Sequence, residues 1–181
     1  MNTIRRLATV GDGQVRALAA LLIDCVEGGA SVSFMLPLTA ERARAFWQRV
    51  AQGVHDGERA LLVAEDAQGT IVGTVQLVLD QPENQPHRAD LAKMLVHRRA
   101  RRQGLGERLM RAAEDTARDC AKTLLVLDTV TGGDAERLYA RLGWQRVGSI
   151  PDYALWPQGG LCATTYFYKK IDARRDQRTG V

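Results

Sequence analysis

The sequence predicts a mixed α/β fold in one domain over residues 1–170, and three observations carry this prediction. The length of 181 residues is typical of a single domain. Hydrophobic spacing switches between helical and strand periods, in the order helix, helix, three strands, helix, strand, helix, two strands. A strand–helix–strand segment, the building unit of α/β domains, lies at the centre of that order.

The first two predicted elements are helices. Asp12 is a good N-cap residue, and the apolar residues after it recur at helical spacing until Gly28 and Gly29 end the pattern. Thr39 precedes a second run of the same kind. Between the two helices, residues 28–37 form an apolar loop that is able to cover a small pocket.

Three strands and a long helix follow. Residues 60–65 and 70–79 are rich in strand-forming residues, and the Asp-Ala-Gln-Gly segment between them favours a turn, so we expect an antiparallel hairpin. Residues 89–96 form the next predicted strand, after a loop with two prolines. Residues 105–120 have the apolar spacing of a strong helix.

The last third of the chain alternates again. Residues 124–128 are almost entirely apolar, which predicts a short strand buried on both faces. Asp134 can cap a helix that ends at the next glycine. Residues 144–149 and 164–170 are predicted to be the last two strands, with a Gly/Pro-rich loop between them. Residues 171–181 are polar and are expected to form a tail outside the domain.

Positive charge is concentrated in one stretch of a chain whose net charge is +4. Between His87 and Arg111, eight Lys or Arg residues stand against two acidic ones, which gives a net charge of +6. Residues 169–181 carry +3, so the remainder of the chain is acidic, at −5. A single positive focus on an otherwise acidic chain predicts an anionic ligand at one place.

The composition argues against several other classes of protein. No apolar run reaches the roughly 18 residues of a membrane-spanning helix, and the first ten residues lack the apolar region of a secretory signal. Cys25, Cys120 and Cys162 are far apart and form no Cys-x-x-Cys pair. We therefore expect free thiols in the cytoplasm, with neither a metal site nor a disulfide framework.

The segment between the strand at 89–96 and the helix at 105–120 has the features of a phosphate site. A helix N-terminus presents free N–H groups and a partial positive charge. Glycines let the backbone approach phosphate oxygens, and arginines add charge-assisted hydrogen bonds. The pattern lacks the Lys-Ser/Thr of a P-loop and the third glycine of a dinucleotide fingerprint. The residues concerned are Arg101, Arg102, Gln103, Gly104, Leu105 and Gly106.

The Arg-x-x-Gly-x-Gly pattern of residues 101–106 resembles the pyrophosphate-binding motif of the GNAT N-acetyltransferases, and the order of elements is similar over most of the chain. The resemblance implies a central, mostly antiparallel twisted sheet with a β-α-β core that binds acetyl-CoA. It also implies that Met94, Leu95 and Val96 offer backbone groups to the pantetheine arm. Tyr139, in a helix followed by Gly-Trp, matches a tyrosine near the coenzyme sulfur and is a candidate catalytic residue.

The segment 28–35 is similar to a loop of tabtoxin-resistance-type acetyltransferases, which implies that Ser31 and Phe34 contact the substrate. In that group, acids on two strands face the substrate, and their positions match Asp90 and Asp128. Asp90 stands where a longer Glu would be expected. Asp128 ends its predicted strand, and strand ends are where α/β sites gather. Each carboxylate is a candidate to anchor the substrate ammonium or to accept its proton, Asp128 first.

These observations predict an enzyme that moves acetyl from acetyl-CoA to a primary amine of a small molecule, such as an amino-acid-like toxin or antibiotic. Two alternatives keep the cofactor: a protein or peptide N-acetyltransferase, and a non-catalytic acetyl-CoA sensor. A nucleic-acid-binding module is disfavoured because the arginine cluster lacks interleaved aromatic residues. We expect a monomer or a homodimer with no membrane partner.

Overall fold

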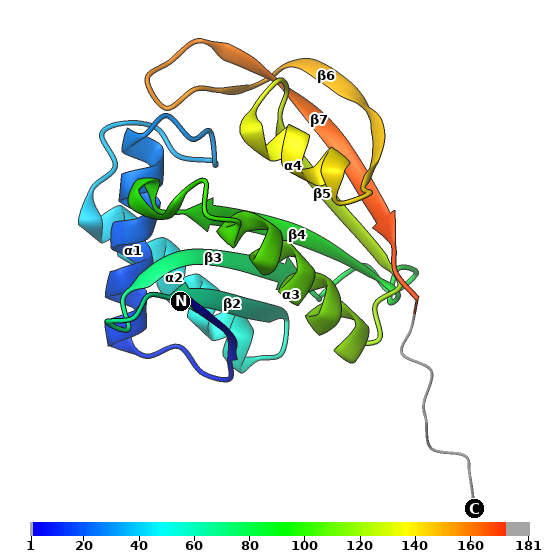
Figure 1. The fold of residues 1–181 in the computed structure, drawn as a ribbon, viewed down its shortest axis with the longest axis horizontal. Helices are drawn as coiled ribbons and strands as arrows, with labels where there is room; N and C mark the ends of the chain where they lie inside the picture. The colour runs from blue at the N-terminus through cyan, green and yellow to red at the C-terminus, as the bar shows by residue number, and fades with distance from the viewer. Residues whose placement is uncertain (1, 173–181) are drawn as a thin grey trace, which may run out of the picture.

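The computed structural model describes residues 2–172, and within them one sheet lies between two pairs of helices (Figure 1). The predicted order of elements is confirmed, with one additional strand at the start. The elements are β1 (Thr3–Leu7), α1 (Asp12–Glu27), α2 (Ala40–His55), β2 (Arg59–Glu65), β3 (Ile71–Val78), β4 (Arg88–Val96), a 3₁₀ turn (Arg98–Ala100), α3 (Leu105–Asp119), β5 (Leu124–Val130), α4 (Asp134–Arg141), β6 (Gln145–Leu155) and β7 (Leu161–Lys170).

The strand order of the described sheet is β1-β2-β3-β4-β5-β7-β6. All neighbours are antiparallel except β4 and β5, which run parallel and pair over three residues only, from Arg88 opposite Leu124 to Asp90 opposite Val126. Beyond Asp90 the two strands diverge, so the sheet splits into two halves that are joined at one end (Figure 1). The mostly antiparallel sheet that the sequence resemblance implied is therefore present.

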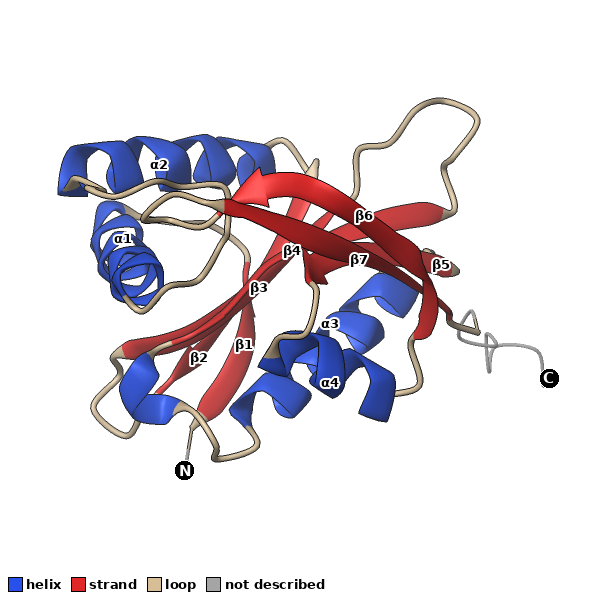
Figure 2. Ribbon diagram, turned by 90° about the horizontal axis from the view of Figure 1, so that it is seen from above, coloured by secondary structure: helices blue, strands red, loops and turns tan. Residues whose placement is uncertain are grey.

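The helices cover opposite faces of this sheet (Figure 2). Helices α1 and α2 pack on one face and enclose a core to which β2 contributes Leu61 and Val63. Helix α3 packs on the other face, over a core that includes Leu62 and Ala64. Because successive side chains of a strand point to opposite faces, β2 is buried on both sides, which explains its continuous apolar sequence.

Strand β1 was not predicted from the sequence. It pairs antiparallel with β2 at the sheet edge, from Thr3 opposite Glu65 to Leu7 opposite Leu61. Only Leu7 is buried, and the adjacent arginines interrupt the apolar alternation that identifies strands. The Arg5 guanidinium forms an ion pair with Glu65 at 2.7 Å, so a charge in the strand contributes to the pairing.

The last two strands are longer than predicted and form a hairpin. Strand β6 continues to Leu155 through register shifts between Arg146 and Gly148 and between Ile150 and Ala154. Pro151 lies in the second shift, and an edge strand tolerates a proline because its outer N–H groups need no partner. The segment predicted as a loop is thus mostly strand, with a turn at residues 156–160.

Strand β5 is buried on one face rather than two, so that prediction is wrong. Leu125 and Leu127 are buried on the α3 side, whereas Val126 is half-buried and Asp128 is exposed. Helices α1 and α2 cover β2, β3 and β4 on the other face and do not reach β5 (Figure 2). An apolar run of five residues does not reveal this one-sided burial. Ile171 is buried in the α3-side core, and residues 173–181 of the predicted tail lie outside the described residues.

A buried ion pair joins α3 to the C-terminal hairpin. The Lys169 ammonium contacts both carboxylate oxygens of Glu114 at 2.8 Å and donates to the carbonyl of Leu142 at 2.8 Å. The indole N–H of Trp144 donates to the same carboxylate at 3.1 Å. Glu114 is only 6% exposed, so its charge depends on these donors.

We expect Lys169→Met to lower the free energy of unfolding by about 3 kcal/mol, because it leaves the Glu114 carboxylate buried without its cation. Urea denaturation measures this change. The matched control is Lys170→Met, which removes the same charge from an exposed neighbour. An equal loss in both variants would show that the pair contributes no stability of its own.

Candidate functional site

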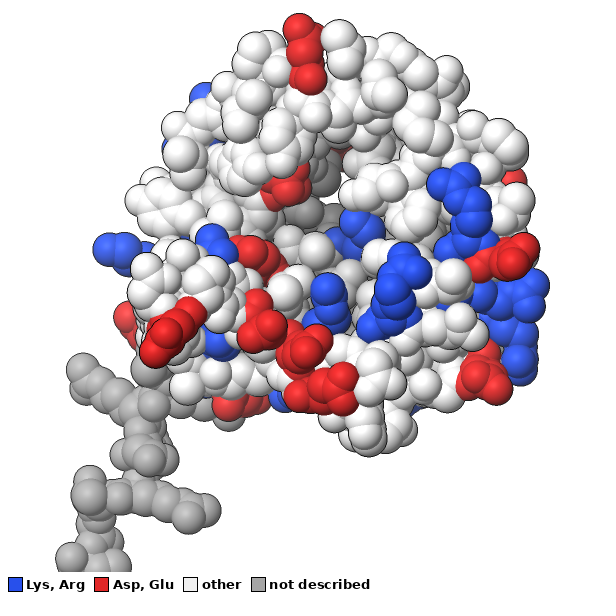
Figure 3. Space-filling model, turned by 180° about the vertical axis from the view of Figure 1, so that it is seen from behind, with Lys and Arg blue, Asp and Glu red and all other residues white. Residues whose placement is uncertain are grey.

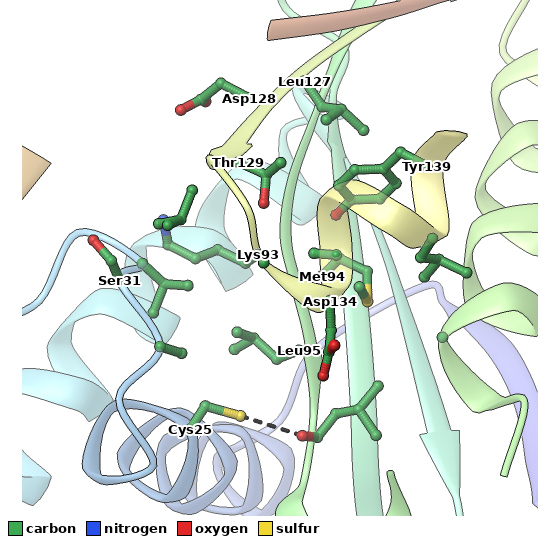
Figure 4. Close-up of a pocket in the computed structure, with 18 of the residues that line it drawn as sticks. Cys25, Ser31, Lys93, Met94, Leu95, Leu127, Asp128, Thr129, Asp134 and Tyr139 are labelled. Carbon is green, nitrogen blue, oxygen red and sulfur yellow. Dashed lines mark hydrogen bonds between the residues drawn. The ribbon is translucent and has the colours of Figure 1, made fainter. Parts of the chain in front are cut away.

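A cleft of about 1240 Å³ lies where β4 and β5 diverge. Its walls come from β4, the turn and first residues of α3, the end of β5 and helix α4 (Figure 4). The loop at residues 28–35 and the β6–β7 hairpin complete its lining. The face of the molecule that carries α2 is hollowed near its centre, with acidic and basic side chains around the hollow (Figure 3).

The turn after β4 is held by hydrogen bonds to both of its neighbours. Asp24 on α1 accepts from the Arg98 backbone N–H at 2.9 Å and from its Nε at 2.8 Å. Burial favours a neutral Asp24, but these bonds and the adjacent His97 outweigh it and hold the pKa of Asp24 below its usual value. Arg99 contacts Asp66, in the β2–β3 turn, at 2.8 Å. Two arginines of the basic stretch therefore position the turn.

Arg101 and Arg102 line the cleft instead. The Arg101 Nε donates to the carbonyl of Val96 at 3.1 Å, which fixes its guanidinium beside the end of β4. Arg102 makes no hydrogen bond or ion pair with another residue of the described chain. Both are therefore placed to meet an anion that enters from solvent.

The two glycines of the motif have different structural roles. Gly104 is the N-cap of α3 and adopts a left-handed conformation, with φ of 71°, that favours glycine. A Cβ on Gly106 would lie 3.2 Å from the Leu138 side chain, so this glycine lets α3 and α4 pack closely. The helix starts at Leu105, and its first N–H groups lie at the cleft wall without helical partners.

Tyr139 reaches the middle of the cleft from α4. Its ring packs against Trp144 and Phe167, with centroids 6.0 Å away in both cases, and the residue is 5% exposed. The hydroxyl points into the cleft toward the Met94 side (Figure 4), and it has no hydrogen-bond partner among the described residues. Burial raises the pKa of Tyr139, so the phenol is protonated at neutral pH and can donate a hydrogen bond or a proton.

Asp128 lies at the opposite wall of the cleft, near the end of β5 (Figure 4). Its Oδ2 accepts a hydrogen bond from the Thr164 hydroxyl at 2.9 Å. Beside it on β7, the Tyr166 hydroxyl bonds to that of Tyr153 at 2.8 Å. This hydrogen bond, partial burial and the Asp128 charge raise the pKa of Tyr166 to about 12. The exposed carboxylate thus faces the cleft with neutral hydroxyl groups next to it.

Asp90 is not among the residues that line the cleft. It is the last residue of β4 that pairs with β5, and its Oδ2 is 3.4 Å from both the Arg88 guanidinium and the Gln81 amide. Its Oδ1 is buried and has no hydrogen-bond partner among the described residues. The structure therefore places Asp90 near the branch of the two strands, separate from the wall that holds Asp128, and its catalytic role stays a prediction.

Of the other predicted site residues, some line the cleft and two do not. Met94, Leu95, Val96 and Ser31 line the cleft. The remaining two do not. Phe34 packs edge-on against Phe46 of α2 at 5.3 Å, and the Gln103 amide lies 3.4 Å from the Arg99 carbonyl.

Sequence reasoning gave no role to Lys93, which lines the cleft beside Ser31 (Figure 4). A lysine inside the otherwise apolar run of residues 91–96 is the signal that could have identified it.

The loop at residues 28–37, which was expected to cover a small pocket, is bonded to the β6–β7 hairpin. The Ser31 hydroxyl donates to the Leu155 carbonyl, and the Leu36 N–H donates to the Pro157 carbonyl, both at 2.8 Å. Within residues 2–172, no group of three potential metal ligands occurs, and no helix is long and apolar enough to cross a membrane. The three cysteines are free thiols.

Several solved structures that are named as acetyltransferases have a similar fold. An N-acetyltransferase from Staphylococcus aureus Mu50 superimposes with a TM-score of 0.77 at 16% identity, over 95% of this chain and 99% of its own. An acetyltransferase from Salmonella typhimurium, in a structure with its cofactor acetyl-CoA, gives 0.76 at 19% identity, over 99% of both chains. A ribosomal-protein-alanine N-acetyltransferase from Brucella melitensis gives 0.76 at 23%, over 93% and 99%.

The sequence comparisons agree with the fold. An uncharacterized N-acetyltransferase in the hisH–hisA intergenic region of Azospirillum brasilense is 32% identical over 128 residues, which cover 70% of this chain and 74% of that protein. Residues 20–144 match the model of the acetyltransferase (GNAT) family. The chain therefore belongs to the GNAT acetyltransferase family and is an acyltransferase.

Proposed function

We propose that this protein transfers an acetyl group from acetyl-CoA to a primary amine of a small molecule. The observation that carries the proposal is the cleft itself. One end presents the α3 N-terminus with Arg101 and Arg102, the middle presents the Tyr139 hydroxyl, and the far wall presents the Asp128 carboxylate. An anion site, a proton donor and a carboxylate are thus lined up along one continuous channel.

The chain has the groups that acetyl-CoA would need. Arg101, Arg102 and the N–H groups at residues 104–106 form a cationic cradle for the pyrophosphate. Past Asp90, β4 has no strand partner on the β5 side, so its backbone from Met94 can bond to an extended amide chain such as the pantetheine arm. The acetyl-CoA in the Salmonella neighbour supports this assignment.

Acetyl-CoA supplies the acetyl group as a thioester. A free alkyl amine has a pKa of about 10, so at neutral pH it must lose a proton before it attacks. Asp128 is placed to anchor the ammonium and to accept that proton, directly or through water. Tyr139 carries its proton at neutral pH and is the candidate donor to the departing thiolate.

The loop and the hairpin that meet beside Asp128 favour a small acceptor molecule. The bonds from Ser31 to Leu155 and from Leu36 to Pro157 join the two loops beside the cleft, where a protein chain would need an open groove. The similarity of residues 28–35 to tabtoxin-resistance-type enzymes favours an amino-acid-like toxin or antibiotic as acceptor. The enzyme is proposed to act as a monomer or a homodimer.

Calorimetry with acetyl-CoA and thiol release with a panel of small amines test the proposal together. We expect acetyl-CoA binding and amine-dependent release of the coenzyme thiol. No binding of acetyl-CoA would overturn the proposed function. Binding with turnover of peptides only would indicate a protein acceptor, and binding without turnover of any amine would indicate a sensor.

We expect Gly104→Val to abolish acetyl-CoA binding, because a β-branched residue resists the left-handed conformation that starts α3. The stability cost of about 1 to 2 kcal/mol is not specific to the cleft. Gly57→Val is the matched control, since Gly57 has φ of 77°, also has open space around it, and lies between α2 and β2. Loss of acetyl-CoA affinity in both variants would show a general folding defect.

We expect Asp128→Asn to lower kcat by about 100-fold, because the amide can no longer accept the ammonium proton, while acetyl-CoA affinity stays within twofold of wild type. Steady-state kinetics and calorimetry measure the two quantities. Asp80→Asn, at an exposed position outside the cleft, controls for the loss of a negative charge. If turnover and affinity fell by the same factor, Asp128 would be a structural residue.

A further inference from the structure

Lys93 occupies an irregular position on β4 that turns its side chain into the cleft. The β3–β4 register shifts there, so that Thr74 pairs with Leu95 but Gln76 pairs with Ala92. Lys93 lies in this bulge with φ of 50°, which is uncommon for a residue with a side chain. Bulges and positive φ angles recur beside functional sites, where they redirect a side chain.

The bulge sends neighbouring side chains to different walls. Lys93 extends toward Ser31 and the loop at residues 28–35, whereas Met94 extends toward Tyr139 (Figure 4). Lys93 is therefore on the acceptor side of the cleft, away from the α3 N-terminus that carries Arg101 and Arg102.

The Lys93 ammonium has no carboxylate in direct contact among the described residues, although the charge of Asp128 acts on it from a longer distance. It donates one hydrogen bond, to the Ser33 hydroxyl at 3.2 Å, and lies 5.6 Å from the centroid of the Phe46 ring. No carboxylate of the described residues forms an ion pair with it. An ammonium has three donors, so two remain for a ligand. Lys93 is half-buried, and burying a charged group costs free energy unless it is paired, so an anion that accepts its unused hydrogen bonds would offset this cost.

Charges around Lys93 give the acceptor end a dipolar character. Burial lowers the pKa of Lys93, the negative charge of Asp128 raises it, and the nearby Arg59 lowers it. Arg59 donates to the Gln76 side chain at 2.9 Å and adds positive potential on the same side. The carboxylate of β5 thus faces a cationic group on β4 across the cleft, which is complementary to a ligand with both charges.

We propose that Lys93 binds a carboxylate of the acceptor, so that the substrate class is an amino acid or a close analogue, with its amine toward Asp128 and its carboxylate toward Lys93. This inference rests on the proposed function and adds a specificity-determining residue to it. Ser33 positions the ammonium. Binding both ends of the acceptor orients the amine for attack and selects against amines without an acid group.

The test compares free amino acids with their carboxamides, which keep the amine and lose the negative charge. Thiol release is measured at saturating acetyl-CoA for wild type, Lys93→Met and the control Lys170→Met, which removes a lysine charge outside the cleft. Met matches the length of the lysine stem and places no new demand on the positive φ, since both residues carry a Cβ. Calorimetry with acetyl-CoA accompanies each variant.

For wild type and Lys170→Met, we expect kcat/KM to favour the best amino acid over its carboxamide by about 10- to 100-fold, the range of a charge-assisted hydrogen bond. In Lys93→Met, kcat/KM for the acid should fall to that of the carboxamide, mainly through KM. The carboxamide value and the acetyl-CoA affinity should change less than about threefold, since neither depends on the carboxylate contact.

Other outcomes would overturn the inference in distinguishable ways. Equal losses for acid and carboxamide in Lys93→Met would show that the residue only shapes the loop through Ser33. Weaker acetyl-CoA binding in that variant would assign Lys93 to the coenzyme. Wild-type turnover with no preference for the acid would remove the carboxylate subsite and leave the proposed function intact. No turnover of any amine would overturn the proposed function together with the inference.

Discussion

The short parallel pairing of β4 and β5 is the constraint on which the rest of the structure depends. Three residue pairs hold the two halves of the sheet together, and from Asp90 onward the strands separate. The separation leaves one edge of β4 without a strand partner and opens a cleft that reaches from α3 to the β6–β7 hairpin. Continued pairing would bury that edge and close the cleft that Tyr139 and Asp128 line.

The basic stretch that stands out in the sequence has two structural uses. Arg98 and Arg99 are committed to Asp24 and Asp66, on either side of the turn after β4. These ion pairs are formed before any ligand arrives, so the turn that begins α3 is preorganised and little entropy is lost when an anion binds there. Arg101 and Arg102, which line the cleft, are the part of the positive charge left for a ligand.

The sequence predicted the parts of the fold that have a local signature and missed those that depend on distant partners. The helices and central strands follow from hydrophobic period, and the phosphate motif from Gly104 and its arginines. Strand β1 was missed because its pairing with β2 comes from tertiary context. Which side chains line the cleft is harder to predict. Lys93 faces the cleft because β4 bulges against β3 at that residue. Asp90 lies outside the cleft because it sits where β4 and β5 are still paired.

Two of the bonds that join the loop at residues 28–35 and its continuation to the hairpin have backbone carbonyls as acceptors, at Leu155 and Pro157. A third runs from the Cys162 thiol to the Ser31 hydroxyl at 3.7 Å. None of these three bonds uses the side chain of Tyr153 or Trp156. Tyr153 and Trp156 line the cleft from that hairpin, and they can be replaced while the hairpin stays bonded to the loop at residues 28–35. The fold thereby separates the scaffold that encloses the acceptor from the surface that selects it, and leaves selectivity free to evolve without rebuilding the enclosure.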